Sequence, residues 1–338
     1  MRALLAAAVA LFGGAAPGLA QAPEGPSLAG KTVSVFIGFG TGGNYDSWGR
    51  TVARHIGKHL PGRPVVVPQN MPGAGGLVAA NSIYNIAPKD GTAMAIVASS
   101  TPLATILGAP GARFDATKFT YLGTPTPETC VCVAFNRPQM KVRTLKDLYD
   151  TEFVVGSSGP GSGTYTWPKT LNALLGMKFK IVIGFPSITN GMLAMERGEV
   201  DGLCTTYEGI VNLRPDWIEE RKLTILLQGG AAPNPELKDV AFATDLAKTA
   251  QERTALAFVF AGLGFGRPFI APPAMAPERA KMLQDAFMAT MQDPDFRADA
   301  QRQRLDVDPK DGPSLAALIG TIHATPKAVV DRVVELIK

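Results

Sequence analysis

The chain has 338 residues, of which 46% are hydrophobic, and its formal net charge is +4. Its lysine and arginine residues are scattered and form no basic block, which argues against nucleic acid and against an anionic membrane surface as partners. A chain of this length exceeds what one hydrophobic core usually accommodates, so we expect two lobes.

Residues 1–22 have the pattern of a secretory signal peptide. Arg2 gives a positive start, residues 3–12 are apolar, and Ala20-Gln21-Ala22 offers an A-x-A cleavage site. The apolar run is too short to span a membrane, and no later segment reaches about 18 uninterrupted apolar residues. We therefore expect a soluble, exported mature protein.

Export bears on the three cysteines, because disulfides form in oxidising compartments. Cys204 can pair with Cys130 or with Cys132, which leaves one thiol over. The alternative is that all three are small buried hydrophobic residues. The sequence leaves these readings open.

A strand, a glycine-rich turn and a helix open the mature chain. We expect the strand within 33–39 and the turn at 40–43. One face of the helix carries apolar residues at every fourth position, namely Trp48, Val52, Ile56 and Leu60. This geometry points backbone N–H groups and the positive end of a helix dipole at one spot, which attracts an anion.

The following segment repeats this order. We expect a strand at 64–67, a glycine-rich turn at 70–76 with a helix to 86, a strand at 93–98 and a polar loop at 99–102. Alternating strands and helices predict a largely parallel sheet with helices on its faces. Ligands gather at the carboxyl ends of such strands, so these loops should share one rim.

A second strand–turn–helix unit follows, with a strand at 153–155, a glycine- and serine-rich turn at 156–164 and a helix that ends at Gly176. Further strands are expected at 131–135, 180–184, 200–205 and 223–227, and helices near 145–149, 190–197 and 245–250.

The last part of the chain, from residue 257 on, is predicted to be mainly helical. A strand is expected at 257–265, a proline-rich connection at 268–277, and helices from Pro277, around 315–322 and from Pro326. We expect these helices to pack on the first sheet. The predicted division is one lobe of 31–128 plus 256–338 and a second lobe of 129–255, with two crossing segments.

Two glycine motifs suggest nucleotide binding, but neither has its context. Residues 38–43 match G-x-G-x-x-G, yet no acidic residue occurs between Asp46 and Asp90 to hold a ribose. Residues 25–32 match the phosphate-binding P-loop pattern, yet no strand precedes them and a strand follows. No cofactor is expected.

Catalytic and metal-binding patterns are equally weak. G-x-S-x-G is absent, and a nucleophile would have only His55, His59 or His323 as a histidine base. His55 and His59 are four residues apart on one helix, but no third metal ligand is evident. Neither an enzyme nor a metal site is expected. Asp46 either ties down the first turn and complements the helix dipole or contacts a ligand.

Two donor-rich loops remain, one in each predicted lobe. A buried carboxylate needs hydrogen-bond partners. Backbone amides and hydroxyls can supply them from Thr41, Gly42, Gly43, Ser99, Ser158, Gly161 and Ser162.

These loops carry a family resemblance. The chain resembles the Bug family, the periplasmic solute receptors of tripartite tricarboxylate transporters. The residues that carry it are Gly42-Gly43-Asn44-Tyr45-Asp46 with Arg50, Asn70-Met71-Pro72-Gly73-Ala74-Gly75-Gly76, Pro88-Lys89-Asp90-Gly91 and Ser158-Gly159-Pro160-Gly161-Ser162. Their order and spacing cover nearly the whole mature chain.

The resemblance implies a type II periplasmic binding protein fold, with two α/β lobes joined by crossing strands and a ligand cleft between them. It implies a monomeric periplasmic receptor that closes on a small carboxylate and delivers it to integral-membrane permease subunits. The implied ligand-binding residues are Phe39, Thr41, Gly42, Gly43, Asn44, Tyr45, Asp46, Ser99, Ser100, Thr101, Ser158, Gly161, Ser162, Gly163, Thr164, Ser187 and Thr189.

Three departures from the family pattern keep the ligand open between di- or tricarboxylates and an aromatic acid. Gly40-Thr41 replaces a common proline, Pro186-Ser187-Ile188 replaces Tyr-x-Gly, and Gln69 replaces an acid. Aromatic residues that flank the loops include Tyr45, Trp48, Tyr165 and Trp167, although both tryptophans also suit a core. An alternative function is a periplasmic sensor that presents its ligand to a signalling partner.

Overall fold

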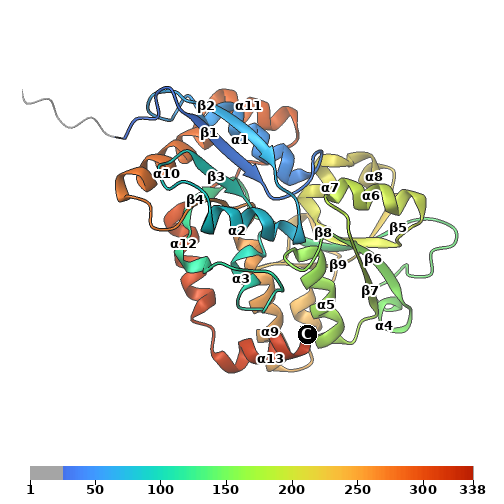
Figure 1. The fold of residues 1–338 in the computed structure, drawn as a ribbon. Helices are drawn as coiled ribbons and strands as arrows, with labels where there is room; N and C mark the ends of the chain where they lie inside the picture. The colour runs from blue at the N-terminus through green and yellow to red at the C-terminus, as the bar shows by residue number, and fades with distance from the viewer. Residues whose placement is uncertain (1–25, 338) are drawn as a thin grey trace, which may run out of the picture.

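The computed structural model describes residues 26–337. The predicted signal peptide, residues 1–22, lies outside this range. The described chain forms two α/β lobes, each built around one mixed sheet (Figure 1). This architecture confirms the predicted fold class.

The first sheet has the strand order β11-β4-β10-β3-β1-β2. Its parallel part consists of β1 (Thr32–Ile37), β2 (Val65–Asn70) and β3 (Ala93–Ile96). Alternate residues of β1, namely Val33, Val35 and Ile37, are fully buried. They pack under α1 (Asn44–Ile56), whose apolar stripe gives the helix its inner face.

Three strands complete this sheet: β4 (Thr120–Thr124), β10 (Phe269–Ala271) and β11 (Lys310–Asp311). The strand β10 runs antiparallel between β3 and β4, although its residues come from the proline-rich connection predicted at 268–277. Its three residues are all buried. A strand this short carries little periodicity, so its place is set by the sheet rather than by its own sequence.

The second sheet has the order β7-β6-β8-β5-β9, formed by β5 (Cys130–Phe135), β6 (Phe153–Ser157), β7 (Phe179–Ile183), β8 (Gly202–Thr206) and β9 (Leu223–Gly229). The strand β6 is parallel to β7 and β8, whereas β5 is antiparallel to β8 and β9. The chain passes from β4 to β5 and returns from β9 to β10, so two segments cross between the sheets.

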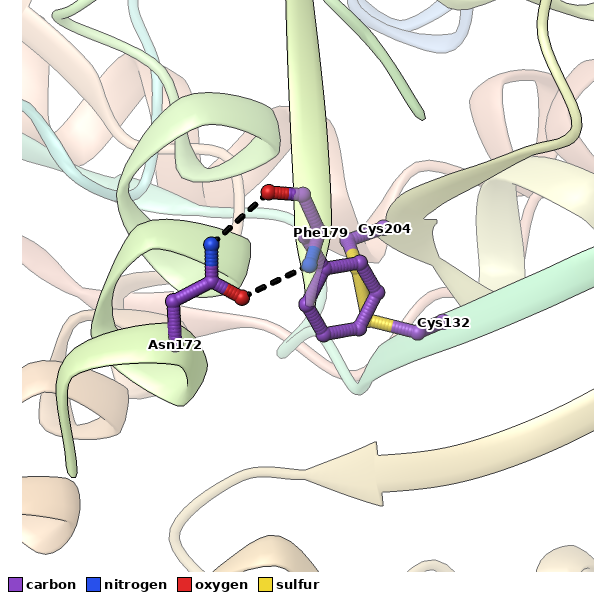
Figure 2. Close-up of a disulfide and its surroundings, with 4 residues drawn as sticks. All are labelled: Cys132, Asn172, Phe179 and Cys204. Carbon is purple, nitrogen blue, oxygen red and sulfur yellow. Dashed lines mark hydrogen bonds between the residues drawn. A yellow bond between two sulfur atoms is a disulfide. The ribbon is translucent and has the colours of Figure 1, made fainter. Parts of the chain in front are cut away.

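A disulfide joins Cys132 of β5 to Cys204 of β8, and Cys130 is free and buried. The strand register decides this pairing, because Cys132 lies directly opposite Cys204 while Cys130 lies opposite Thr206. Figure 2 shows the disulfide beside Phe179, whose backbone is held by the side chain of Asn172.

The helices around the sheets are α2 (Leu77–Asn85), α3 (Thr101–Ala104), α4 (Asp147–Asp150), α5 (Gly163–Leu175), α6 (Ile188–Arg197), α7 (Tyr207–Leu213) and α8 (Pro215–Glu219). Short 3₁₀ turns lie at Ala74–Gly76, Ala116–Lys118, Pro235–Leu237 and Ala243–Leu246. Within the described range, no helix is both long enough and apolar enough to cross a membrane.

The strand predicted at 257–265 is wrong. This segment forms the end of helix α9 (Ala250–Phe260) and a 3₁₀ turn, Ala261–Phe265. Thr249 and Glu252 form a capping box at the start of α9. A short apolar run does not separate a buried helix from a buried strand, and the capping box is the sequence signal that could have decided between them.

The tail helices are α10 (Pro277–Gln292), α11 (Pro294–Arg302), α12 (Gly312–His323) and α13 (Lys327–Ile337). As predicted for the tail, α10 and α12 pack on β4 of the first sheet, and α11 packs on α1. The last helix differs, because α13 contacts α9 and α5, a helix of the second lobe (Figure 1). Its buried Val333 joins an apolar core that includes residues from both lobes.

Candidate functional site

A cavity of about 60 Å³ lies where the loops of the two lobes meet. A buried water needs roughly 10–15 Å³, so there is room for a few water molecules. Its wall includes the predicted site residues Phe39, Gly43, Asn44, Tyr45, Ser99, Ser158, Ser162, Gly163, Thr164 and Ser187. Ala98, Trp167, Ile188, Thr205 and Thr206 also line it and were not predicted as ligand contacts. Thr205 and Thr206 end β8, so the strand-end argument applied to the other loops could have found them.

Three long helices begin at this cavity, and the short helix α7 begins beside them at Thr206. The N-cap residues Gly43 of α1, Ser162 of α5 and Ser187 of α6 all line its wall. The first N–H groups of a helix have no partner within the helix, and the helix dipole makes this end positive. Neither Gly43 nor Ser162 makes a side-chain capping bond, so the start of each helix remains available to an anion.

Asn44 is the residue whose hydrogen bonding is incomplete. Its side chain is 3% exposed and lines the cavity, yet its Nδ2 and Oδ1 atoms have no hydrogen-bond partner within the described residues. A buried amide without partners costs free energy. Because Asn44 lines the cavity, a solute held there would lie against this side chain.

Unlike Asn44, Asp46 has several hydrogen-bond partners within the protein. Its carboxylate accepts hydrogen bonds from the backbone N–H of Gly42 (2.9 Å), from Arg50 Nε (2.9 Å) and from Asn70 Nδ2 (2.8 Å). Burial raises the pKa of Asp46, but these hydrogen bonds outweigh burial and hold it below its usual value. Of the two readings, the structure favours the one in which Asp46 ties down the first turn.

The other predicted residues do not line this cavity. Thr41 and Gly42 are exposed on the first turn, and Thr101 is buried at the start of α3. Ser100 and Gly161 form a contact between the lobes, because Ser100 Oγ donates to the Gly161 carbonyl at 2.7 Å. Thr189 Oγ1 donates to the carbonyl of Gly42 in a second such contact. A third joins the Gly40 N–H to the Pro186 carbonyl at 2.9 Å. The lobes are therefore closed on each other.

Of the four aromatic residues that flank the predicted loops, two line the cavity and two do not. Tyr45 stacks on Phe39 with ring centroids 4.5 Å apart, and both line the cavity. Trp167 lines it as well while packing in the core, whereas Trp48 is fully buried away from it. Tyr165 lines a separate cavity of about 240 Å³ on the other side of the Ser100–Gly161 contact.

A buried charge cluster that the sequence did not reveal lies behind the wall. Tyr45 donates its hydroxyl to Glu128 Oε1 (3.2 Å) and accepts from the Ser99 N–H (3.2 Å). Arg267 Nη2 lies 3.3 Å from Glu128 Oε1, and both side chains are fully buried. Burial raises the pKa of Glu128 to about 7, although Arg267 acts in the opposite direction. Isolated charges so far apart in the chain give no pattern that sequence reasoning could use.

His55 and His59 contact acidic residues of the tail rather than a site. His55 Nε2 lies 3.0 Å from Asp299, and His59 Nε2 lies 2.6 Å from Asp293. The first contact joins α1 to α11, and the second joins the turn after α1 to Asp293, the N-cap residue of α11. Across residues 26–337, no group of three or more His, Cys, Asp or Glu side chains is arranged to hold a metal ion.

Comparisons with known proteins agree with this architecture. No protein-family model matches the chain. It is 27% identical over 315 residues to the "UPF0065 protein in gbd 5'region" of Cupriavidus necator, covering 88% of this chain and 85% of that protein.

Two solved structures share the fold. MatC (Rpa3494) from Rhodopseudomonas palustris, with bound malate, superposes with a TM-score of 0.69 at 21% identity, covering 91% of this chain and 99% of that one. The periplasmic binding protein BugD superposes with a TM-score of 0.67 at 18% identity, covering 90% of this chain and 96% of that one. These comparisons confirm the resemblance to the Bug family.

Proposed function

We propose that this protein is a periplasmic solute-binding receptor that captures a small organic carboxylate between its two lobes. The observation that carries the proposal is the convergence of three helix N-termini, from both lobes, on one cavity whose Asn44 amide has no partner. Helix N-termini bind anions, and a carboxylate also offers acceptors to the amide donor of Asn44. That MatC was solved with malate supports the same ligand class.

Hydrogen bonds to the solute would supply a large part of the binding energy. Each charge-assisted hydrogen bond contributes roughly 1.5–3 kcal/mol net. Four such bonds would supply about 6–12 kcal/mol before the cost of association, and micromolar binding corresponds to about 8 kcal/mol. Backbone N–H groups and hydroxyls at the cavity can therefore supply a gross energy of this order without an arginine in contact with the ligand, and burial of the solute's apolar atoms has to offset the cost of association.

The contacts between the lobes support capture by closure. Gly40 and Gly42 of the first lobe bond to Pro186 and Thr189 of the second, so the cavity is covered when the lobes meet. A solute that enters the open form and is buried on closure loses its water, which strengthens its hydrogen bonds. The open and closed forms would give a membrane permease a signal of whether the receptor is loaded.

Two features support export to the periplasm. The predicted signal peptide precedes the fold, and the Cys132–Cys204 disulfide is of the kind that persists in an oxidising compartment. We assign delivery to an integral-membrane permease as the physiological role. Loss of carboxylate uptake on deletion would support this role, whereas intact uptake with a lost transcriptional response would favour the sensor.

Isothermal titration of the purified mature protein with malate, adipate, citrate and benzoate tests the proposal. The corresponding uncharged amides, such as adipamide and benzamide, are the matched controls. We expect at least one of the four carboxylates to bind at micromolar concentration or more tightly and to stabilise the protein by about 2.7 kcal/mol at 100 times its dissociation constant. If none of the four binds at millimolar concentration, the proposed ligand class is wrong.

A further inference from the structure

Glu128 and Arg267, which are both fully buried, form a cluster with the half-buried Glu208 next to residues that line the cavity. Three residues that line the cavity connect it to this cluster, namely Tyr45, Ser99 and Thr206. The Tyr45 hydroxyl donates to Glu128, the Ser99 N–H donates to the Tyr45 hydroxyl, and Arg267 donates to the Thr206 hydroxyl. Tyr45 joins the cavity directly to Glu128, because its ring forms part of the wall and its hydroxyl donates to the carboxylate. A charge in the cavity therefore acts on Glu128 across a buried, poorly screened path.

The charged and titratable groups that face Glu128 come from four parts of the fold. Arg267, just before β10, has Nη2 at 3.3 Å and is fully buried. Glu208 on α7 accepts from the Thr129 N–H at 3.1 Å with each oxygen, and burial raises its pKa. Tyr45 on α1 and Cys130 on β5 have pKa values raised by burial, so both are neutral near pH 7.

This cluster holds two carboxyl groups and one guanidinium. Arg267 Nε and Nη1 have no hydrogen-bond partner within residues 26–337, so the guanidinium is only partly compensated by its neighbours. With both glutamates ionised, the cluster carries a net negative charge before any solute arrives. A solute carboxylate in the cavity would then add a third negative charge to a site with one positive charge. Protonation of a glutamate relieves this repulsion.

Resting on the proposed function, we propose that carboxylate capture is coupled to proton uptake at Glu128, so that the receptor binds its solute together with a proton. Glu128 is the group that responds, because it is fully buried, bonds to the cavity-lining Tyr45 and lies beside Arg267. Once Glu128 is neutral, it no longer offsets the positive charge of Arg267, which then attracts the solute carboxylate.

The sign of the resulting pH dependence follows from linkage. The pKa of Glu128 is about 7 in the free protein, and a nearby anion raises it further. Affinity is therefore highest below pH 7 and weakens as the pH rises above 7. The dissociation constant rises up to tenfold for each unit by which the solute raises this pKa. Carboxylic acids such as malate and adipate are ionised over this range, so their own titration does not produce the effect.

Calorimetric titration with malate or adipate, whichever binds more tightly, tests the inference. The measurement is repeated between pH 6 and pH 9 in buffers of different ionisation enthalpy, which yields the number of protons taken up. We expect net uptake that is largest just above pH 7, together with the fall in affinity. Binding with no proton exchange and a constant affinity would overturn the inference while leaving the proposed function standing.

Three variants test which carboxyl group takes up the proton. Glu128→Gln should abolish both the uptake and the pH dependence, and at pH 9 it should bind at least as tightly as the unmodified protein. Glu152→Gln removes an exposed carboxylate on the second lobe and should change neither. Uptake that survives in Glu128→Gln and is lost in Glu208→Gln would overturn the assignment to Glu128. Failure of malate, adipate, citrate and benzoate to bind at any pH would overturn the proposed function as well.

Discussion

Replacement of Asn44 by leucine should weaken ligand binding and strengthen the fold at the same time. Leucine has nearly the shape of asparagine but no polar atoms. In the free protein the Asn44 amide is buried and makes no hydrogen bond with the described residues. An unsatisfied buried polar group costs about 1–3 kcal/mol, so its removal should raise the free energy of unfolding by about 1 kcal/mol or more.

Binding should change in the opposite direction. A hydrogen bond from the Asn44 amide to a ligand carboxylate is worth about 1.5–3 kcal/mol, which corresponds to a dissociation constant roughly 10 to 150 times higher in the variant. Isothermal titration with the carboxylate that binds best measures this change. Urea unfolding of the ligand-free protein measures the stability.

Asn172→Leu is the matched control. Asn172 donates to the Phe179 carbonyl and accepts from the Phe179 N–H, both at 2.8 Å (Figure 2), and neither residue lines the cavity. Its replacement leaves two backbone groups without a partner, so we expect lower stability, by about 1–3 kcal/mol, with unchanged affinity. The reasoning is refuted if Asn44→Leu loses stability as Asn172→Leu does, or if it binds the carboxylate normally.

Two further predictions concern lobe closure and the disulfide. A Cβ at Gly161 would lie 2.4 Å from Leu77 Cγ and 2.6 Å from the Ala74 carbonyl of the opposite lobe, so Gly161→Ala should hold the lobes apart. For Gly161→Ala we expect a larger radius of gyration by X-ray scattering and at least tenfold weaker binding. The control is Gly320→Ala, at an exposed position of α12 with open space around it, which should only raise the free energy of unfolding by about 1 kcal/mol. Unchanged scattering in Gly161→Ala would contradict the closure model. Replacement of both Cys132 and Cys204 by alanine removes a link across 72 residues and should lower the free energy of unfolding by about 4 kcal/mol. Cys130→Ala, which keeps the disulfide, should cost far less, and equal losses in urea unfolding would count against the pairing.

The sequence determined the local units and their common edge. Glycine-rich turns between a strand and a helix predicted which loops carry Gly43, Ser99, Ser158 and Ser162, because consecutive parallel strands end at the same edge of a sheet. These signals are local, and each involves only neighbouring residues. The same reasoning narrowed the disulfide to two pairings without choosing between them.

Tertiary structure decided everything that depends on register, burial or distant contacts. Cys132 rather than Cys130 meets Cys204 because of how β5 pairs with β8. Asn44 faces the cavity while Asp46 bonds to Arg50 and Asn70, although the two residues belong to the same turn. The direction of each side chain depends on how α1 is oriented about its axis and on the residues that pack around it.

The Glu128–Arg267 pair shows the same division most clearly. The two residues meet because the chain crosses between the lobes twice, and the pair is buried only when both sheets are in place. Neither residue stands out in the sequence, since a glutamate or an arginine in an irregular segment is ordinarily exposed. Loss of water around the pair, a property of the assembled fold, is what gives this carboxyl its raised pKa and the protein its proposed sensitivity to pH.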